Sequence, residues 1–266
     1  MPENGPGFQS TGRRPPPAPE SMPLAVLYQD AWLIAVDKPP GLVVHPTYRN
    51  WSGTLLNGLL WHVSAGTEPR IVTRLDKNTS GLVLVALSAD VHRQMQRDAA
   101  AGRVTKEYLA IVEGVPSPAR GSIEAPLARS AADRRLVVVD AAGQPCRTDY
   151  ELLASSADPA SRIPDPASRI PAPASRIPDP GSRALVRCEL VTGRTHQIRV
   201  HLASRGWPIV GDPVYGAPEA GVARQALHAW RVTLPHPISR EILRLEVPLP
   251  ADLRALFRGP HGHVDL

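Results

Sequence analysis

Residues 71–87 read IVTRLDKNTSGLVLVAL, two apolar stretches on either side of a short polar segment. The second stretch is rich in Leu and Val, which predicts a buried β-strand. The polar segment holds a single carboxylate, Asp76, between the cations Arg74 and Lys77. We expect these opposite charges to keep Asp76 ionised. A lone ionised carboxylate suits nucleophilic attack or proton abstraction better than acid catalysis. A surface turn with an Arg–Asp pair has the same local sequence.

Strands are predicted for most of the other apolar segments. They are a hairpin at 25–41 and further strands within 106–114, 136–144, 146–154, 184–193, 226–234 and 242–250. Helices are predicted at 89–103, 195–206 and 251–257, with Thr195 as the N-cap of the second and Gly102 and Gly206 as helix stops. A parallel sheet would need a helix between most strands. We therefore predict an α+β fold, a mostly antiparallel mixed sheet with a few flanking helices.

Proline marks segments outside the predicted hydrophobic pattern. The chain of 266 residues contains 30 prolines, concentrated in residues 1–23 and 155–183. We expect residues 1–22 to form a disordered tail. The second cluster reads ASRIPDP, ASRIPAP and ASRIPDP in succession, and two prolines per repeat exclude a helix. We predict one catalytic domain at 23–266, with an extended proline-rich insertion at about 155–183 in place of a hairpin loop.

The composition limits the classes of function. A net charge of +5 favours a polyanionic partner without establishing one. No apolar run approaches the roughly 20 residues of a membrane span, and the N-terminal residues lack the apolar core of a secretory signal. Cys146 and Cys188 have no metal-type spacing, so we expect two buried free thiols. These features together predict a cytoplasmic protein without a membrane segment.

Motifs for nucleotide cofactors and metals are missing from the sequence. Neither GxxxxGK[ST] nor GxGxxG occurs. His196 and His201 are five residues apart, which places them about 140° apart around a helix. A two-histidine zinc helix needs a spacing of four. No second acid accompanies Asp76, as a paired-carboxylate hydrolase would require. We therefore expect no cofactor and no metal.

Four separate segments indicate one protein family when they are considered together. They are VTRLDKNTSGLVLVALS at 72–88, KEYLAIVEG at 106–114, GRTHQIRVHLASRGWPIVGDPVYG at 193–216 and ALHAWRVTLPHP at 226–237. In this order they closely resemble the RluA family of RNA pseudouridine synthases, without its S4 domain. The resemblance implies the pseudouridine synthase fold and the isomerisation of specific uridines in ribosomal or transfer RNA to pseudouridine through a catalytic aspartate.

The resemblance also implies roles for individual residues. Asp76 matches the catalytic aspartate of the family, and Arg74 matches the arginine that aids base flipping. Tyr108 matches the tyrosine that packs against the target uracil. Arg199 is expected to pair with the catalytic carboxylate, and Ile198 to help wall the pocket. Taken singly, Tyr108 would be assigned to the core and Arg199 to a helix surface.

The sequence departs from the family pattern in two places. Thr73 stands where the family usually has His, which puts the role of that His in doubt here. The proline-rich repeat has no counterpart in the common pattern. About 22 residues precede the first predicted strand, too few for the S4 RNA-binding domain that many relatives carry. For Trp207 and Tyr215 the sequence allows either stacking on RNA or structural packing.

Pseudouridine formation neither oxidises nor adds a group, which agrees with the missing cofactor motifs. We expect a monomer that acts on structured RNA. Two other classes of function are compatible with parts of the sequence. One is an RNA-binding protein on the same scaffold without catalysis, and the other is a metal-dependent hydrolase.

Overall fold

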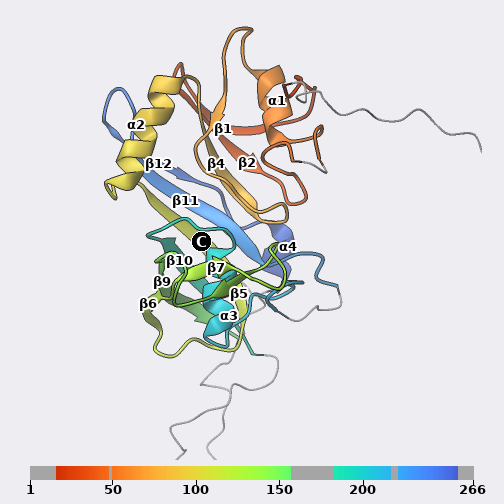
Figure 1. Ribbon diagram of the computed structural model, residues 1–266, viewed down its shortest axis with the longest axis vertical. Helices are drawn as coiled ribbons and strands as arrows, with labels where there is room; N and C mark the ends of the chain where they lie inside the picture. Colours follow the sequence, from red (N-terminus) through yellow and green to blue (C-terminus); the bar gives the residue numbers. More distant parts are fainter. Residues whose placement is uncertain (1–15, 48–49, 157–181, 217–220, 257–266) are drawn as a thin grey trace, which may run out of the picture.

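The computed structural model describes residues 16–47, 50–156, 182–216 and 221–256. In this part of the chain, ten strands form one mixed sheet, two more form a separate hairpin, and four helices flank them (Figure 1). All but one of the strand pairs are antiparallel, the exception being the pair β4–β11. The predicted α+β class is therefore confirmed.

The long strand order of the sheet is β1-β2-β4-β11-β5-β10-β9-β6, with β12 paired to β11 and β3 paired to β4. The strands are β1 (Ala25–Gln29), β2 (Leu33–Lys38), β3 (Arg70–Ile71), β4 (Ser80–Ala86), β5 (Thr105–Glu113), β6 (Arg120–Glu124), β9 (Arg147–Ser155), β10 (Arg183–Leu190), β11 (Leu227–Pro235) and β12 (Ile242–Glu246). The separate hairpin consists of β7 (Leu127–Arg129) and β8 (Val137–Val139). The predicted hairpin at 25–41 is β1 and β2. Neither β6 nor β7 was predicted.

The proline-rich repeat lies outside the described residues, but the two strands that flank it are described. β9 and β10 pair antiparallel, with Ser155 opposite Ala184 at the end nearest the repeat. The prediction that the repeat stands between two hairpin strands agrees with this pairing.

Two halves of the sheet meet at a short contact between β4 and β11. These parallel strands pair at only two positions, His228 with Ser80 and Ala229 with Gly81. Gly81 has a φ of +108°, and a Cβ there would lie 2.2 Å from the Ala229 carbonyl oxygen. Glycine is therefore required for this approach. The polar segment that contains Asp76 ends at this junction.

The four helices are α1 (Leu55–His62), α2 (Ala89–Ala100), α3 (Gln197–Ser204) and α4 (Ala251–Leu256). The last three were predicted, and α1 was not. A capping box formed by Thr54 and Asn57 starts α1. The prediction that Thr195 caps α3 is wrong, because the N-cap is His196 in a left-handed conformation without a side-chain cap.

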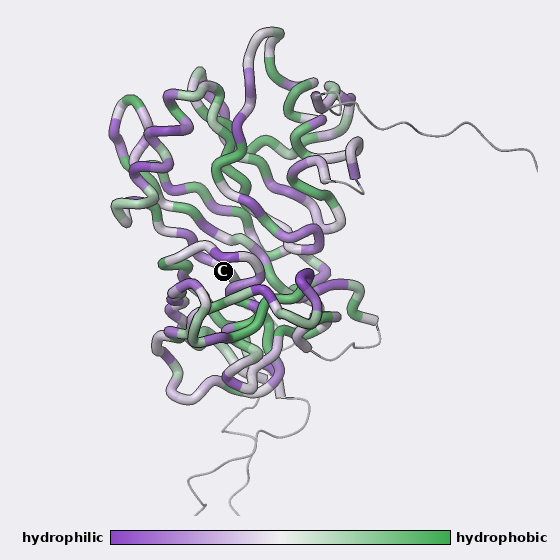
Figure 2. Tube along the Cα trace, in the orientation of Figure 1, coloured by the Kyte–Doolittle hydropathy of each residue, from purple (hydrophilic) through white to green (hydrophobic). Residues whose placement is uncertain are grey.

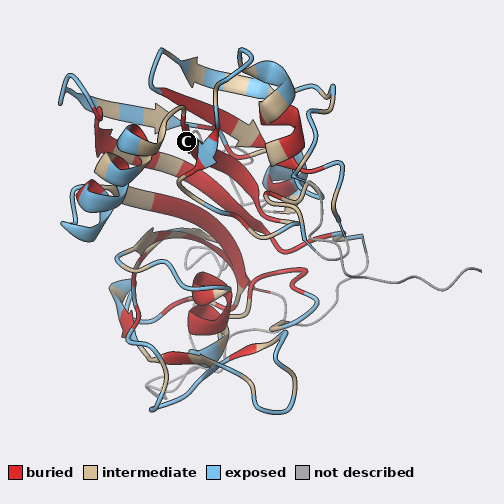
Figure 3. Ribbon diagram, turned by 45° about the horizontal axis from the view of Figure 1, so that its top comes forward, coloured by how far each residue is buried: buried red, intermediate tan, exposed pale blue. Residues whose placement is uncertain are grey.

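Hydrophobic stretches of the chain follow the strands, whereas many loops are hydrophilic (Figure 2). The central strands are buried along most of their length, and α3 is buried much more than α2 (Figure 3). Cys146 and Cys188 are both free and buried, as predicted. Among the described residues, no helix is long and apolar enough to cross a membrane.

The predicted tail at residues 1–22 is described from residue 16 onward. In this described part, the Glu20 N–H donates to the Asn57 carbonyl, and the Ala18 carbonyl accepts from the Asn57 side chain. The Glu20 carboxylate also accepts from the Gly53 N–H. The described end of the tail therefore packs on α1, and the boundary expected at residue 22 moves toward the N-terminus.

Alternating charges cross one face of the sheet from strand to strand. Glu107 on β5 pairs with Arg187 on β10 and with Arg231 on β11. Arg187 also pairs with Glu151 on β9, and Arg231 with Glu246 on β12. Opposite charges thus compensate each other on this face. Tyr108 follows Glu107 in β5, so its ring lies on the opposite face.

Stability is expected to fall in acid because of His228, which is buried at the β4–β11 junction. Its two ring nitrogens contact the Ser80 hydroxyl and the Val247 carbonyl, and burial lowers its pKa to about 4. A neutral ring satisfies both contacts, so protonation favours the unfolded chain. The contribution of the neutral His228 ring to the unfolding free energy is about 3 kcal/mol. It is fully present above the unfolded pKa of about 6.5 and is lost as the pH falls toward 4. Denaturant titrations between pH 7 and 4 test this.

The variant His228→Asn is the matched control for that titration. Its amide keeps one donor and one acceptor but does not titrate in this range. The acid-induced loss in unfolding free energy should be smaller in the variant than in the parent protein. Equal losses in the two proteins would contradict the assignment to His228.

Candidate active site

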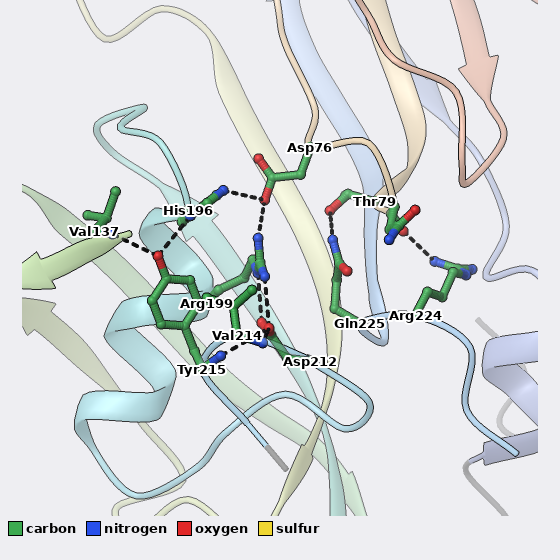
Figure 4. A network of polar contacts seen from close by, with 11 residues as sticks. Asp76, Thr79, Val137, His196, Arg199, Asp212, Val214, Tyr215, Arg224 and Gln225 are labelled. Atoms are coloured by element: carbon green, nitrogen blue, oxygen red, sulfur yellow. Dashed lines mark hydrogen bonds and ion pairs between the residues drawn. The ribbon is translucent and has the colours of Figure 1, made fainter. Parts of the chain in front are cut away.

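The segment that carries Asp76 is held from several sides. The Lys77 carbonyl accepts from the Gly41 N–H and from the Lys38 ammonium. On the other side, the Gln225 side chain donates to the Thr79 hydroxyl at 3.2 Å (Figure 4). These contacts reach residues 76–79 from β2, from the turn after it and from the segment before β11. The carboxylate therefore sits on a well-anchored loop.

Lys38 is a buried cation beneath this loop, and sequence reasoning missed it. Its side chain is fully buried and donates to the carbonyls of Pro39, Leu42 and Lys77. Burial and the charge of Arg224 lower its pKa to about 8. Three carbonyl acceptors match the three donors of an ammonium group, so Lys38 joins the β2 turn to the loop of Asp76.

Asp76 makes its ion pair with Arg199, the last residue of the HQIR segment, which lies in the first turn of α3. Arg199 Nη1 lies 2.8 Å from Asp76 Oδ2, and the arginine side chain is 5% exposed whereas that of Asp76 is 27% exposed. Among the described residues, neither Arg74 nor Lys77 forms an ion pair with Asp76; both are exposed. The prediction that these two neighbours hold the carboxylate is therefore wrong, and the partner is the one that the family resemblance implied.

Arg199 is itself held by a second carboxylate. Its Nε and Nη2 each donate to Asp212 over 2.7 Å, and Asp212 is fully buried. Burial would raise the pKa of Asp212, but the Arg199 guanidinium and two backbone N–H groups bring it below its usual value. The guanidinium thus bridges an inner carboxylate and an accessible one (Figure 4).

His196 approaches the same oxygen of Asp76. Its Nε2 lies 3.8 Å from Asp76 Oδ2, and its Nδ1 lies 2.8 Å from the Tyr215 hydroxyl. Burial lowers the pKa of His196, and the nearby charge of Asp76 raises it only in part. The ring is therefore neutral near pH 7 and provides a polar contact instead of a formal charge.

Tyr108 is close enough to Asp76 to be affected by its charge, and Ile198 precedes Arg199 in α3. Tyr108 is 8% exposed. Its burial, and to a smaller extent the negative charge of Asp76, raise its pKa well above the ordinary range. Within the described part of the chain, its hydroxyl has no hydrogen-bond partner. Ile198 is buried next to Arg199 in α3. A neutral aromatic ring is thus close to the Asp76 carboxylate, and an aliphatic side chain lies next to Arg199 along α3.

A family model of RNA pseudouridylate synthases matches residues 32–204. The chain belongs to this family. It is 41% identical over 261 residues to the ribosomal large subunit pseudouridine synthase D of Nitrosomonas europaea, a match that covers 92% of this chain and 69% of that protein. An uncharacterized RNA pseudouridine synthase of Bacillus subtilis is 35% identical over 266 residues, covering 96% of this chain and 80% of that protein.

Solved structures of the pseudouridine synthase family have the same fold. The human RNA pseudouridylate synthase domain containing 4 superposes with a TM-score of 0.63 at 25% identity, covering 87% of this chain and 91% of that one. The human RNA pseudouridylate synthase domain containing 1 gives a TM-score of 0.62 at 24% identity, covering 85% of this chain and 83% of that one. The chain is thus a pseudouridine synthase, an isomerase that acts on RNA.

Other predicted positions in this pseudouridine synthase have distinct surroundings. Arg74 is exposed, and its positive charge adds to the effect of burial in lowering the pKa of His45. Thr73, in place of the usual family His, accepts a hydrogen bond from the Leu84 N–H at 2.8 Å. Trp207 packs against Tyr150, with ring centroids 5.2 Å apart, which favours structural packing over stacking on RNA.

Substitutions at Tyr108 are expected to separate the role of the ring from that of the hydroxyl. Tyr108→Phe should retain most turnover because the face of the ring is kept, whereas Tyr108→Ala should lose much more. Base–aromatic stacking is worth about 1–3 kcal/mol, so the Ala variant should lose about five- to 150-fold. Single-turnover assays with saturating RNA measure both. Equal losses in the two variants would assign the function to the hydroxyl.

Proposed function

We propose that Asp76 is the catalytic carboxylate with which this pseudouridine synthase isomerises uridine in large-subunit ribosomal RNA. The main support is one arrangement: a partly exposed carboxylate on an anchored loop, paired with a buried arginine. The pair fixes one carboxylate oxygen of Asp76, while the 27% exposure of its side chain leaves the group within reach of a nucleotide. Its ionised form is the one that can attack or accept a proton.

The reaction changes the attachment of the base to the sugar. The C1′–N1 bond breaks, the uracil turns, and a C1′–C5 bond forms; the hydrogen on C5 leaves and N1 gains one. Atoms and charges therefore balance without a further reactant. Asp76 can attack C1′, attack C6 of the base, or remove a proton from C2′. The geometry around Asp76 is compatible with each of these three paths.

The other residues are assigned to holding the flipped base. A base must leave its stack before the sugar is accessible, at a cost of a few kcal/mol. Arg74, which is exposed, is assigned to the gap that the base leaves in the RNA. Tyr108 supports the face of the uracil, and Ile198 closes the apolar side of the pocket. Arg199 stays with Asp76, because its other donors are bound to Asp212.

Large-subunit ribosomal RNA is favoured as the substrate by the names of the relatives. Those of Nitrosomonas europaea and Zymomonas mobilis, 41% and 34% identical to this chain, are both called ribosomal large subunit pseudouridine synthase D. Transfer RNA was an equal alternative from the sequence, and no relative described above carries a name that refers to it. We therefore assign the ribosomal substrate.

The purified protein tests this assignment with two RNA pools. Unmodified large-subunit ribosomal RNA and a set of unmodified transfer RNAs are transcribed in vitro and incubated with the protein, and pseudouridine is located by mass spectrometry. The expected result is pseudouridine at specific positions of the ribosomal RNA. Modification of transfer RNA alone would overturn the substrate assignment, and binding without any modification would favour a non-catalytic RNA-binding protein.

A further inference from the structure

The segment GDPVYG at 211–216 contributes two side chains to the group around Asp76. Asp212 contacts Arg199, and Tyr215 contacts His196 (Figure 4). Two chains of contacts, here called the Asp212 branch and the Tyr215 branch, thus connect this turn with the Asp76 carboxylate. Tyr215 also lies beside the guanidinium, whose carbon is 5.1 Å from the ring centroid. Asp212 was not predicted to take part in the site, and for Tyr215 the sequence left stacking on RNA and structural packing open.

The Asp212 branch determines which way the guanidinium faces. Two parallel hydrogen bonds of 2.7 Å, from Nε and Nη2, fix the plane of Arg199. This geometry leaves Nη1 for Asp76, at 2.8 Å. With Asp76 as the sole acceptor, the guanidinium could rotate and offer any of its donors.

Asp212 is in turn fixed by its own turn. Its Oδ1 accepts from the backbone N–H groups of Val214 and Tyr215 at 2.9 and 3.2 Å. The preceding Gly211 has a φ of +69°, and a Cβ there would lie 2.6 Å from the Arg224 carbonyl oxygen. The turn therefore requires glycine and gives the carboxylate little freedom.

The Tyr215 branch orients the imidazole of His196. The Val137 N–H donates to the Tyr215 oxygen at 2.9 Å, so the phenolic hydrogen is available for His196 Nδ1 at 2.8 Å. The neutral ring then carries its proton on Nε2, the nitrogen that faces Asp76 at 3.8 Å. His196 is also one of only two non-glycine residues with a positive φ in the described part of the chain. Such backbone strain is often found at functional sites.

We infer that Asp212 and Tyr215 are positioning residues, which act through Arg199 and His196 to orient the Asp76 carboxylate toward the substrate. This inference rests on the proposed catalytic role of Asp76. Asp212 touches neither the accessible side of Asp76 nor solvent, so its contribution is transmitted by the guanidinium. A purely structural role would instead lower stability and leave the turnover of each folded molecule unchanged.

The experiment compares the full-length variants Asp212→Asn, Asp212→Glu and Tyr215→Phe with the parent protein on transcribed large-subunit ribosomal RNA. Single-turnover rates at saturating RNA are divided by the folded fraction, and RNA affinity is measured separately. We expect a loss of about ten- to a hundredfold for Asp212→Asn, as for a lost charged hydrogen bond. Asp212→Glu, which keeps the charge, should recover part of it. Tyr215→Phe should lose about three- to tenfold, as for a neutral hydrogen bond.

Asp98→Asn is the matched control. Asp98 is also a buried carboxylate held by guanidinium groups, those of Arg103 and Arg240, but it lies on α2, well apart from α3 (Figure 1). Its loss should reduce stability without changing turnover per folded molecule. A full rate in folded Asp212→Asn, or a collapse of RNA affinity at full rate, would overturn the inference.

A measurement without RNA separates this inference from the proposed function. Restricted rotation of the Arg199 guanidinium should give separate ¹⁵N NMR signals for Nη1 and Nη2 in the parent protein, and these should merge in Asp212→Asn. Separate signals in the variant would contradict the positioning role whether or not the RNA substrate is correct. Should Asp212→Asn fail to fold, the rate of Tyr215→Phe decides, and an unchanged rate overturns the inference.

Discussion

Asp76→Asn is expected to abolish pseudouridine formation while the protein still folds and binds RNA. Asparagine keeps the shape of the side chain but cannot act as a nucleophile or accept a proton as a carboxylate does. The change also removes a charge next to Arg199 without leaving that arginine unpaired, because Asp212 holds two of its donors. The fold should therefore tolerate the substitution.

The measurement combines single-turnover pseudouridine formation with RNA affinity on the same preparation. Asp90→Asn, at an exposed position on α2, makes the same chemical change away from the site and should behave as the parent protein. Residual activity of Asp76→Asn within about tenfold of the parent, equivalent to only ~1.4 kcal/mol of barrier, would remove Asp76 from the reaction. Loss of RNA binding would instead assign Asp76 to substrate recognition.

Arg199→Met is expected to suppress turnover much more than RNA affinity. Methionine fills a similar apolar space but leaves Asp76 without its cation and Asp212 buried without its partner. A charged hydrogen bond is worth about 1.5–3 kcal/mol, which corresponds to a loss of about ten- to 150-fold. The buried, unpaired Asp212 should also lower the unfolding free energy by about 3–5 kcal/mol.

Turnover in this variant must be divided by the folded fraction, because stability and catalysis change together. Arg240→Met removes an arginine that pairs with a buried carboxylate, Asp98, on a different part of the fold, and serves as the control. It should lose stability and keep its turnover per folded molecule. If Arg199→Met keeps full turnover while affinity collapses, Arg199 is a phosphate contact and not the partner that activates Asp76.

Most long strands could be predicted because their hydrophobic patterns are strong. Strands β2, β4, β5, β10 and β11 contain aliphatic side chains that become buried, whereas β1 and β9 were predicted from apolar residues that stay partly exposed. β6 is short and contains Arg and Glu, and β7 has only three residues, one of them Arg, so neither shows a clear hydrophobic pattern. The helix α1 was missed because its start depends on Asn57 closing the capping box, a residue that also suits turns.

The candidate active site could be predicted only in part from the sequence. Local charge suggested Arg74 and Lys77 as partners of Asp76, but these side chains extend into solvent, and the partner comes from α3. The family resemblance supplied Arg199, which periodicity alone would have placed on a helix surface. Asp212 gave no signal by itself, since its partner is 13 residues away and is brought to it by the fold.

Lys38 is a second example of a buried polar site that the sequence pattern did not predict. Its neighbours in sequence suggested the end of a hairpin, whereas the fold buries its ammonium among three carbonyls beneath the loop of Asp76. A carbonyl carries no sequence signature, so such a site is visible only in three dimensions. The same reasoning applies to the Tyr215–His196 contact, which joins a turn to the start of α3.

Mapping of pseudouridine in total RNA gives the most direct test of the central claim, that this chain modifies RNA through Asp76. Three strains are compared: one lacking the gene, one complemented with the parent gene and one complemented with Asp76→Asn at equal protein level. The account predicts that specific pseudouridines in large-subunit ribosomal RNA disappear with the gene, return with the parent gene and stay missing with Asp76→Asn. Restoration of those pseudouridines by Asp76→Asn, or a pseudouridine map unchanged by deletion of the gene, would contradict it.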